Sequence, residues 1–343
     1  MRVKTGSVQS NLFDILSHVD TASQRKSSLD RLAVIDWDLF RPVLEEHLAY
    51  GDQKKGGRPP WCPVLMLKVL VLQRFFDLSD EETEFQIIDR FSFLRFLGLR
   101  PGDGAPDHAT IWSFKERLGA DGMLAVFELF NAKLRELGLI ASCGKIIDAS
   151  FVEAPKQRNG RHENEQIKRG EVPERIAKNP RRQCQKDLDA RWTKKNNQSY
   201  YGYKNHVKVD AASKFIETFT VTDAAVHDSQ PVEELLRESD RDAVLWADSA
   251  YVGPAIRAIL KRFAMLASIC EKGNADYPLT QTQKGNNKKK SRIRARVEHT
   301  FGRIAQLGGD RFRRIGKQRC RFETALTNLT YNLDRFAMFH RPA

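Results

Sequence analysis

The spacing of apolar residues changes after about 140 positions, from helical to strand-like. Before this change, Val64 to Phe76 is an apolar segment long enough for a buried helix, and Ser79 begins an S-x-x-E capping box. Asp107 is placed as an N-cap, and the apolar helical face that follows it ends at Gly119. Residues 123–137 are also amphipathic. We therefore predict a nearly all-helical region over residues 1–140.

After this change, short strands alternate with helices. Residues 145–152 are rich in β-branched side chains, while 203–209 and 215–221 have a period of two around a turn and predict a hairpin. Residues 243–247 (AVLWA) suit a strand in the middle of a sheet. We therefore expect an α/β domain with a mixed sheet over residues 141–343. Its remaining predicted elements are helices at 231–237, 255–263, 293–305 and 323–339, and a strand at 264–269.

A long polar stretch from about 156 to 200 interrupts the predicted strands. It contains two prolines, many basic residues and a lone Trp192. A loop of this length is either functional or disordered. Two interpretations stay open: this basic insert becomes ordered on DNA, or it is a flexible excursion from the domain.

Lysine and arginine number 57 against 44 acidic residues, which gives a formal charge of +13. Such an excess favours a polyanionic partner, of which nucleic acid is the most common and an anionic membrane surface the competitor. The longest apolar run, 64–76, is shorter than the roughly 20 residues of a membrane span. The amino terminus has no apolar segment of a signal peptide. We expect a cytoplasmic protein with neither a membrane partner nor a small-molecule substrate.

The five cysteines lie far apart in the sequence. No C-x-x-C motif or close Cys/His pair indicates a zinc site. An odd number of cysteines without a signal peptide fits a reducing cytoplasm.

Three acidic residues have positions that suggest a site. Asp148 lies inside the first strand between apolar neighbours, where a buried, unpaired carboxylate is costly. Asp248 directly follows an apolar strand, at the edge where open α/β sheets bind ligands. Taken alone, Asp148 is compatible with a hairpin turn and Asp248 with a helix cap near Gly253. Glu298 alone is compatible with a solvated i,i+4 partner of Arg294.

Carboxylates from a first strand, a fourth strand and a following helix can converge on one sheet edge. Hard oxygen ligands of this kind suit Mg²⁺ or Mn²⁺, which also bind phosphate oxygens. Two such ions about 3.5–4 Å apart can activate the attacking oxygen and stabilise the leaving oxygen in phosphodiester cleavage. Without metals, three acids would repel DNA, so their presence in a basic chain favours metal binding.

The strings IIDASFVEAP, YGYKNHVKVD, VHDSQP, WADSAYVG and RARVEHTFG resemble the core of DDE transposases from bacterial insertion sequences. The upstream string PDHATIWSFKERL resembles the helical amino-terminal domain of the same group, so the resemblance covers roughly residues 60 to 335. It implies an RNase H-like fold, metal-dependent DNA strand cleavage and strand transfer, with Asp148, Asp248 and Glu298 as the metal-binding triad. It also implies double-stranded DNA as partner, a homodimer in the active complex, and a bacterial, nucleoid-associated location.

One departure from the family pattern concerns the last acid. Many relatives carry a Y-x2-R-x3-E-x6-K signature, in which Arg294 matches here. Ser291 replaces the tyrosine and Ala305 the lysine, so the DNA contacts of those two side chains cannot be carried over. Spacing does not decide which arginine substitutes for them. The candidates are Arg303, Arg311, Arg313 and Arg314.

Seven cations lie among the thirteen residues from Lys284 to Arg296. A solvated basic loop is the simpler interpretation. The alternative is a phosphate-binding patch that leads to the helix of Glu298, and such binding weakens steeply with salt. We predict DNA contacts from Lys288, Lys289, Lys290, Arg292, Arg294, Arg296 and Arg303.

Other motifs have competing interpretations. Residues 107–118 are compatible with the recognition helix of a helix-turn-helix, or with scaffolding or dimerisation. His206 is interpreted as structural or DNA-facing, because no ligand pattern surrounds it. Asp228 is expected to cap the helix after Pro231. Tyr251 is the one tempting nucleophile for a recombinase that forms a covalent protein–DNA intermediate.

The resemblance predicts cleavage at element ends to free a 3′-hydroxyl, followed by attack of that hydroxyl on target DNA. No covalent protein–DNA intermediate is expected. Two alternatives from other classes remain: a metal-dependent nuclease that does not join DNA, and a DNA-binding regulator without catalysis.

Overall fold

The computed structural model describes residues 25–50, 59–141, 143–195, 197–274 and 276–340, together with Ser17, Asp20 and Thr21. The amino-terminal region is helical, as the apolar spacing predicts, although parts of the expected 1–140 domain lie outside the described residues. Its elements are η1 (Asp30–Val34), η2 (Trp37–Phe40), α2 (Arg41–Leu48), α3 (Pro63–Phe75), α4 (Asp80–Asp89), α5 (Phe91–Leu97) and α6 (His108–Glu136).

The predicted helix starts are confirmed by their caps. The Ser79 side chain accepts a hydrogen bond from the Glu82 amide at 3.0 Å, and the Asp107 side chain accepts one from the Thr110 amide at 2.6 Å. The predicted helix stop at Gly119 is confirmed as a break inside α6, with helical segments on both sides of it. Gly119 forms this kink with φ 62° and ψ 177°, a left-handed φ that glycine adopts without a Cβ clash.

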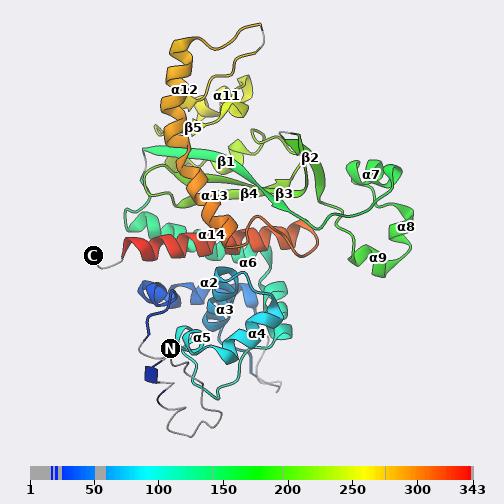
Figure 1. The fold of residues 1–343 in the computed structure, drawn as a ribbon, viewed down its shortest axis with the longest axis vertical. Coiled ribbons are helices and arrows are strands. Elements are labelled where there is room, and N and C mark those ends of the chain that lie inside the picture. The colour runs from blue at the N-terminus through cyan, green and yellow to red at the C-terminus, as the bar shows by residue number, and fades with distance from the viewer. Residues whose placement is uncertain are drawn as a thin grey trace, which may run out of the picture.

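A six-stranded mixed sheet forms the centre of the second half (Figure 1). The hydrogen-bonded order is β2-β3-β1-β5-β6, and β4 also pairs with β3. Strand β3 is antiparallel to β1, β2 and β4, whereas β1, β5 and β6 are parallel. The strands are β1 (Gly144–Glu153), β2 (Arg191–Lys195), β3 (Gln198–Asp210), β4 (Ile216–Asp223), β5 (Val244–Ala247) and β6 (Leu266–Ile269).

The predicted strands and hairpin are confirmed, and the basic insert contains elements that the sequence pattern missed. Strand β2 pairs with the beginning of β3, although its residues are polar. The insert also contains the short helices α7 (Arg161–Lys168), α8 (Glu174–Ala177) and α9 (Pro180–Cys184). The expected helix at 231–237 is reduced to α10 (Val232–Leu235), because Leu236 adopts an extended conformation.

The basic segment after β6 is a helix, α12 (Gln281–Arg294), and the expectation of a loop is wrong. A capping box starts it, with hydrogen bonds from the Gln283 amide to the Thr280 hydroxyl and from the Thr280 amide to the Gln283 side chain. The helix predicted at 293–305 is α13 (Arg296–Gln306), which follows α12 across Ala295. The other helices are η4 (Glu238–Asp240), η5 (Ser249–Tyr251), α11 (Pro254–Arg262) and α14 (Lys317–Phe339).

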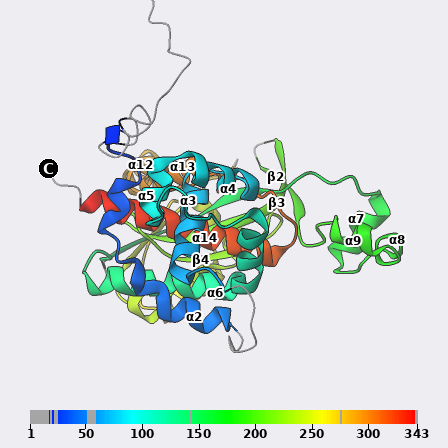
Figure 2. The same cartoon turned by 90° about the horizontal axis from the view of Figure 1, so that it is seen from below.

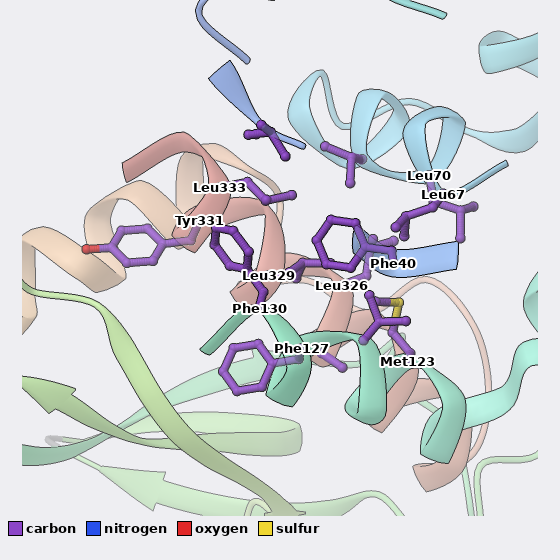
Figure 3. Close-up of a cluster of buried hydrophobic side chains, with 14 of the residues drawn as sticks. Phe40, Leu67, Leu70, Met123, Phe127, Phe130, Leu326, Leu329, Tyr331 and Leu333 are labelled. Carbon is purple, nitrogen blue, oxygen red and sulfur yellow. The ribbon is translucent and has the colours of Figure 1, made fainter. Parts of the chain in front are cut away.

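Helix α14 lies between the sheet and the amino-terminal helices (Figures 1 and 2). Its leucines, including Leu329 and Leu333, meet Phe130 of α6 and Leu70 of α3 in one cluster of buried side chains (Figure 3). That cluster also includes Val207 of β3, so one hydrophobic core joins the helical region to the sheet. The division of the chain into 1–140 and 141–343 stays a prediction.

Buried asparagines attach α14 and α6 to the sheet. Asn332 accepts a hydrogen bond from the Ile216 amide at 3.0 Å and donates to the Ile216 carbonyl and to Asn131, both at 2.9 Å. Asn131 donates to the Ile216 and Glu217 carbonyls of β4, each at 3.1 Å. Backbone groups at the start of β4 thereby gain partners that no neighbouring strand provides.

Within the described residues, no helix is long and apolar enough to cross a membrane.

Candidate functional site

Asp148 lies within β1, and Asp248 directly follows the adjacent parallel strand β5. Ile146 of β1 pairs with Trp246 of β5, and each aspartate lies two residues further along its strand direction. Because parallel strands advance together, the register places the two carboxylates level with each other at one edge of the sheet. The hairpin-turn alternative for Asp148 is wrong, since Asp148 pairs with Val207 of β3 in the middle of a ladder.

Asp248 begins a short 3-10 helix. Its Oδ1 accepts a hydrogen bond from the Ala250 amide at 2.8 Å, which caps η5 directly after β5. The alternative cap near Gly253 is not formed, because Gly253 precedes α11 without a side-chain cap. The cap uses one carboxylate oxygen and fixes the side chain beside β1.

Arg294 connects the strand carboxylate to Glu298. Its Nη1 donates to Asp148 Oδ2 at 2.7 Å, and its Nη2 donates to Glu298 Oε1 at 2.9 Å. Asp148 and Arg294 are mostly buried, whereas 61% of the Glu298 side chain is exposed. The predicted i,i+4 pair of Arg294 and Glu298 is therefore present, and the same guanidinium also reaches β1. One cation brings together acids that are 150 residues apart in sequence.

The buried position of Asp148, close to the charge of Asp248, opposes its ionisation. Burial raises the pKa of Asp148, and the negative charge of Asp248 raises it as well. The hydrogen bond from the Ala149 amide and the charge of Arg294 lower the pKa but do not offset burial. Burial lowers the pKa of Arg294, but the neighbouring Asp148 and Glu298 raise it overall. The site therefore favours a positive charge between the acids.

The donor set suits a hard divalent cation. The Arg294 guanidinium already binds carboxylate oxygens from β1 and α13, and Asp248 at the end of β5 is a third oxygen donor on the neighbouring strand. The part of the chain that the structure describes holds no group of three His, Cys, Asp or Glu side chains close enough to share a metal ion. A cation bound by all three acids would have to take the place of the Arg294 guanidinium.

A row of cations leads along α12 towards these acids. Lys284, Lys288 and Arg292 recur every four residues and therefore lie on one side of the helix. Lys288, Lys289 and Arg292 are exposed, and the described residues provide no ion-pair or side-chain hydrogen-bond partner for them. Like charges at this spacing disfavour a helix by about 0.2–0.5 kcal/mol per pair, which an anionic partner would offset.

The other predicted DNA-contacting residues have internal partners. Lys290 donates to the Ile269 carbonyl at 2.8 Å, and Arg296 donates to the Ala211 carbonyl at 2.7 Å. Arg303 forms an ion pair with Asp334 of α14 at 2.9 Å and lies over the Phe75 ring. Their DNA contacts stay predictions.

The four arginines proposed as substitutes for the missing signature residues differ in exposure. Arg313 pairs with Asp77, and Arg314 with Glu116 and Glu323, which ties both to helices or their connections. Arg303 is held by Asp334, as above. Among the described residues, the Arg311 side chain pairs only with the adjacent Asp310, at 3.5 Å, and 64% of it is exposed. At one of the altered positions, the Ser291 hydroxyl lies 3.6 Å from Cys270 Sγ.

The structure also tests the sequence interpretations of His206 and Asp228. His206 is fully buried and bonds Thr222 Oγ1 at 2.8 Å, and burial lowers its pKa to about 4, so a structural role fits. The expected cap by Asp228 is wrong, because Asp228 accepts a hydrogen bond from Lys204 at 2.7 Å and α10 has no side-chain cap. Sequence reasoning missed this Lys204–Asp228 pair, since its members are 24 residues apart.

Tyr251 is poorly placed for attack on DNA. Only 1% of the residue is exposed, and its hydroxyl has no hydrogen-bond partner among the described residues. Burial raises the pKa of Tyr251 well above its usual value, and the charges of Asp148, Asp228 and Asp248 raise it further. A phenol that is buried and hard to deprotonate is a poor nucleophile.

The strand order, with one aspartate inside β1, another directly after the adjacent parallel strand β5, and an acid on a following helix, fits an RNase H-like core. The family model described as Transposase DDE domain matches residues 141–333, more than half of the chain. The chain therefore belongs to the DDE-type transposases of insertion elements. A second family model, Transposase domain (DUF772), matches residues 17–117. No solved structure matches the chain.

Membership in this family makes the protein a transposase, a DNA-cleaving enzyme that binds DNA, in a family that generally uses divalent metal ions.

Proposed function

We propose that the protein cuts DNA at the ends of its mobile element and joins the freed 3′-hydroxyl to target DNA, with Asp148, Asp248 and Glu298 as the metal-binding residues. The observation that carries this proposal is the Arg294 bridge, which brings Glu298 of α13 to Asp148 of β1 beside Asp248. A metal-dependent nuclease that does not join DNA and a DNA-binding regulator are the alternatives that the experiment below separates.

The two aspartates have different supports. Asp148 is fixed within β1, which pairs with β3 on one side and with β5 on the other. Asp248 is fixed by its cap on η5, which leaves its second oxygen available for a ligand. Glu298 is the most exposed of the three and lies on a separate helix, so its approach depends on how α13 packs.

The proposed metals are two ions of Mg²⁺ or Mn²⁺. When bound, they would supply a positive field that activates the attacking oxygen and stabilises the leaving oxygen of the phosphodiester. The chain's own contribution is to hold the acids together, to exclude a protein nucleophile, and to provide cations for the DNA backbone. The burial of Tyr251 supports a reaction without a covalent protein–DNA intermediate.

Double-stranded DNA is proposed to approach along α12. Lys288, Lys289 and Arg292 are exposed there, and the helix ends at Arg294 beside Asp148. The remaining predicted DNA contacts come from Lys290, Arg296 and Arg303. Their side chains bond to other parts of the protein, which would hold these residues close to the proposed DNA. Displacement of Arg294 by metal ions would free its guanidinium to bind a phosphate oxygen.

The amino-terminal helices are proposed to bind the element ends or to mediate dimerisation. A homodimer in the active complex, and association with the nucleoid while bound to DNA, belong to the same proposal.

The experiment is cleavage of labelled DNA that carries the element's own ends, with Mg²⁺ or Mn²⁺. Wild type should cut and join, while Asp148→Asn and Asp248→Asn should bind DNA without cutting. Asp242→Asn is the matched control, because Asp242 is exposed at the opposite end of β5 and should retain activity. Cutting without joining would favour the nuclease, and binding without cutting by wild type would favour the regulator. A covalent protein–DNA adduct would contradict the proposed reaction.

A further inference from the structure

The insert between β1 and β2 projects away from the rest of the molecule (Figures 1 and 2). We call residues 156–186, with helices α7, α8 and α9, the insert lobe. Its buried apolar side chains are Ile167, Pro173 and Ile176, so it has only a small core of its own. A lobe that buries so little of its surface contributes little to folding, and its side chains remain available to a partner.

The insert lobe is strongly basic. It contains ten lysines and arginines against four glutamates. Two of its cations form exposed i,i+4 pairs, Arg161 with Glu165 and Lys178 with Glu174. Six others are exposed, and the described residues offer their side chains neither an ion pair nor a hydrogen bond: Lys156, Arg158, Lys168, Arg169, Arg175 and Arg181.

A buried aspartate fixes the base of the lobe to the catalytic region. Asp187 is 3% exposed and accepts hydrogen bonds from the Tyr203 hydroxyl of β3 at 2.7 Å and from the Gly316 amide before α14 at 3.2 Å. Asp189 accepts one from the Lys317 amide at 2.9 Å. Strand β3 and the start of α14 therefore hold the segment that follows α9.

Arg191 connects this base to the first helix of the lobe. Its guanidinium donates to the Ile167 carbonyl at the end of α7 at 2.7 Å and to the Leu188 carbonyl at 2.7 Å. Gln157 completes the link by accepting a hydrogen bond from the Asp187 amide at 3.1 Å. These contacts attach the base of the lobe and the end of α7 to β2 and β3, and β3 pairs with β1. They favour order at the base of the insert over a flexible excursion, and ordering on DNA stays a prediction.

We infer that the insert lobe is a second DNA-binding surface, which contacts the phosphate backbone of duplex DNA at a distance from the cleavage site. This inference rests on the proposed function for its choice of DNA. The charge favours phosphates over a protein partner, because six free cations with few exposed apolar side chains suit an electrostatic, wet interface. Because the base of the lobe is fixed, its contacts with DNA phosphates would lie at a set separation from Asp148 and Asp248.

The test compares DNA binding by wild type and by the triple variant Arg169→Gln/Arg175→Gln/Arg181→Gln. Fluorescence anisotropy with a long labelled duplex in EDTA, over a range of salt, measures affinity without cleavage. Loss of three phosphate contacts should lower the slope of log affinity against log salt by about 2.7. Between 50 and 200 mM salt, wild-type affinity should therefore fall about 40-fold more than that of the variant.

The matched control is Arg257→Gln/Lys261→Gln, which removes two exposed charges from α11 that have no ion-pair partner among the described residues. Its salt slope should stay at the wild-type value. Thermal unfolding of all three proteins should agree, because none of these side chains has an internal contact to lose. An unchanged slope in the lobe variant, or a change in its oligomeric state by sedimentation instead, would overturn the inference.

The experiments distinguish an error in the inference about the lobe from an error in the proposed function. If the lobe is not a DNA surface, wild type and lobe variant bind equally at every salt concentration, whether or not the protein cuts DNA. If the proposed cleavage is wrong, no cutting occurs with Mg²⁺ or Mn²⁺, while the salt slope of the lobe variant still falls.

Discussion

Replacing Arg294 with glutamine removes the cation that bridges Asp148 and Glu298. The bond to Asp148 is charge-assisted and mostly buried, so its loss costs about 1.5–3 kcal/mol. The bond to Glu298 is at an exposed i,i+4 position and contributes only about 0.3–0.5 kcal/mol. We expect a total loss near 2 kcal/mol without metal. At about 2.1 cal/mol/K of unfolding entropy per residue, this corresponds to a fall of about 3 °C in the melting temperature of the 343-residue chain.

Divalent metal should stabilise Arg294→Gln more than it stabilises wild type. In wild type, a metal ion has to displace the guanidinium, whereas in Arg294→Gln it meets the acids without a competing cation. The variant should therefore gain more stability from metal than wild type does. A saturating ligand at about 100 times its Kd contributes about 2.7 kcal/mol, enough to offset the cost of the substitution.

The assay is differential scanning calorimetry of both proteins in EDTA and with Mg²⁺ or Mn²⁺. Arg296→Gln is the control, because Arg296 follows at the same helix junction but donates to the Ala211 carbonyl rather than to an acid. It should show the same metal-induced shift as wild type. A smaller metal-induced shift in Arg294→Gln than in wild type would refute the competition and make Arg294 a supporting residue for the metal site.

Three further predictions concern buried polar side chains. The folded-state pKa of His206 is about 4, below its usual 6.5. The free energy of unfolding should therefore decline by about 3 kcal/mol as the pH falls from above 6.5 to 4. Urea unfolding of His206→Gln should lack this part of the decline. Asn332→Ala removes three hydrogen bonds and leaves the buried Ile216 amide without a partner, which should cost about 3 kcal/mol in the same assay; a loss under 1 kcal/mol would contradict the attachment of α14 to β4. Tyr251→Phe deletes a hydroxyl without a partner among the described residues and should retain cutting and near wild-type stability; loss of cutting with retained folding would revive a role for the phenol.

Local patterns were sufficient for much of the fold. Periods of two predicted the β3–β4 hairpin, and side-chain caps at Ser79 and Asp107 predicted where α4 and α6 begin, because a cap depends on residues three positions apart. The same logic failed for the polar strand β2, whose only reason to extend is its pairing with β3. It also failed for α12, which is a helix although its charges repel one another.

The sequence also predicted only part of the candidate site. An aspartate inside an apolar strand and another directly after one can be found in the sequence, because burial of an acid is visible from its neighbours. Glu298 could not be distinguished from a solvated helix acid until Arg294 was seen to contact both it and Asp148, which lies 146 residues from Arg294.

By itself, the sequence determined the apolar helices and strands with strong local patterns, the excess of positive charge, and the two aspartates, since these depend on residues within a turn or a strand. Only the tertiary structure decided that α14 joins both halves in one core, that Asp187 fixes the insert lobe, and that one guanidinium lies between two of the three acids. The physical reason is that such contacts depend on how distant elements pack, and no local spacing encodes the distance between them.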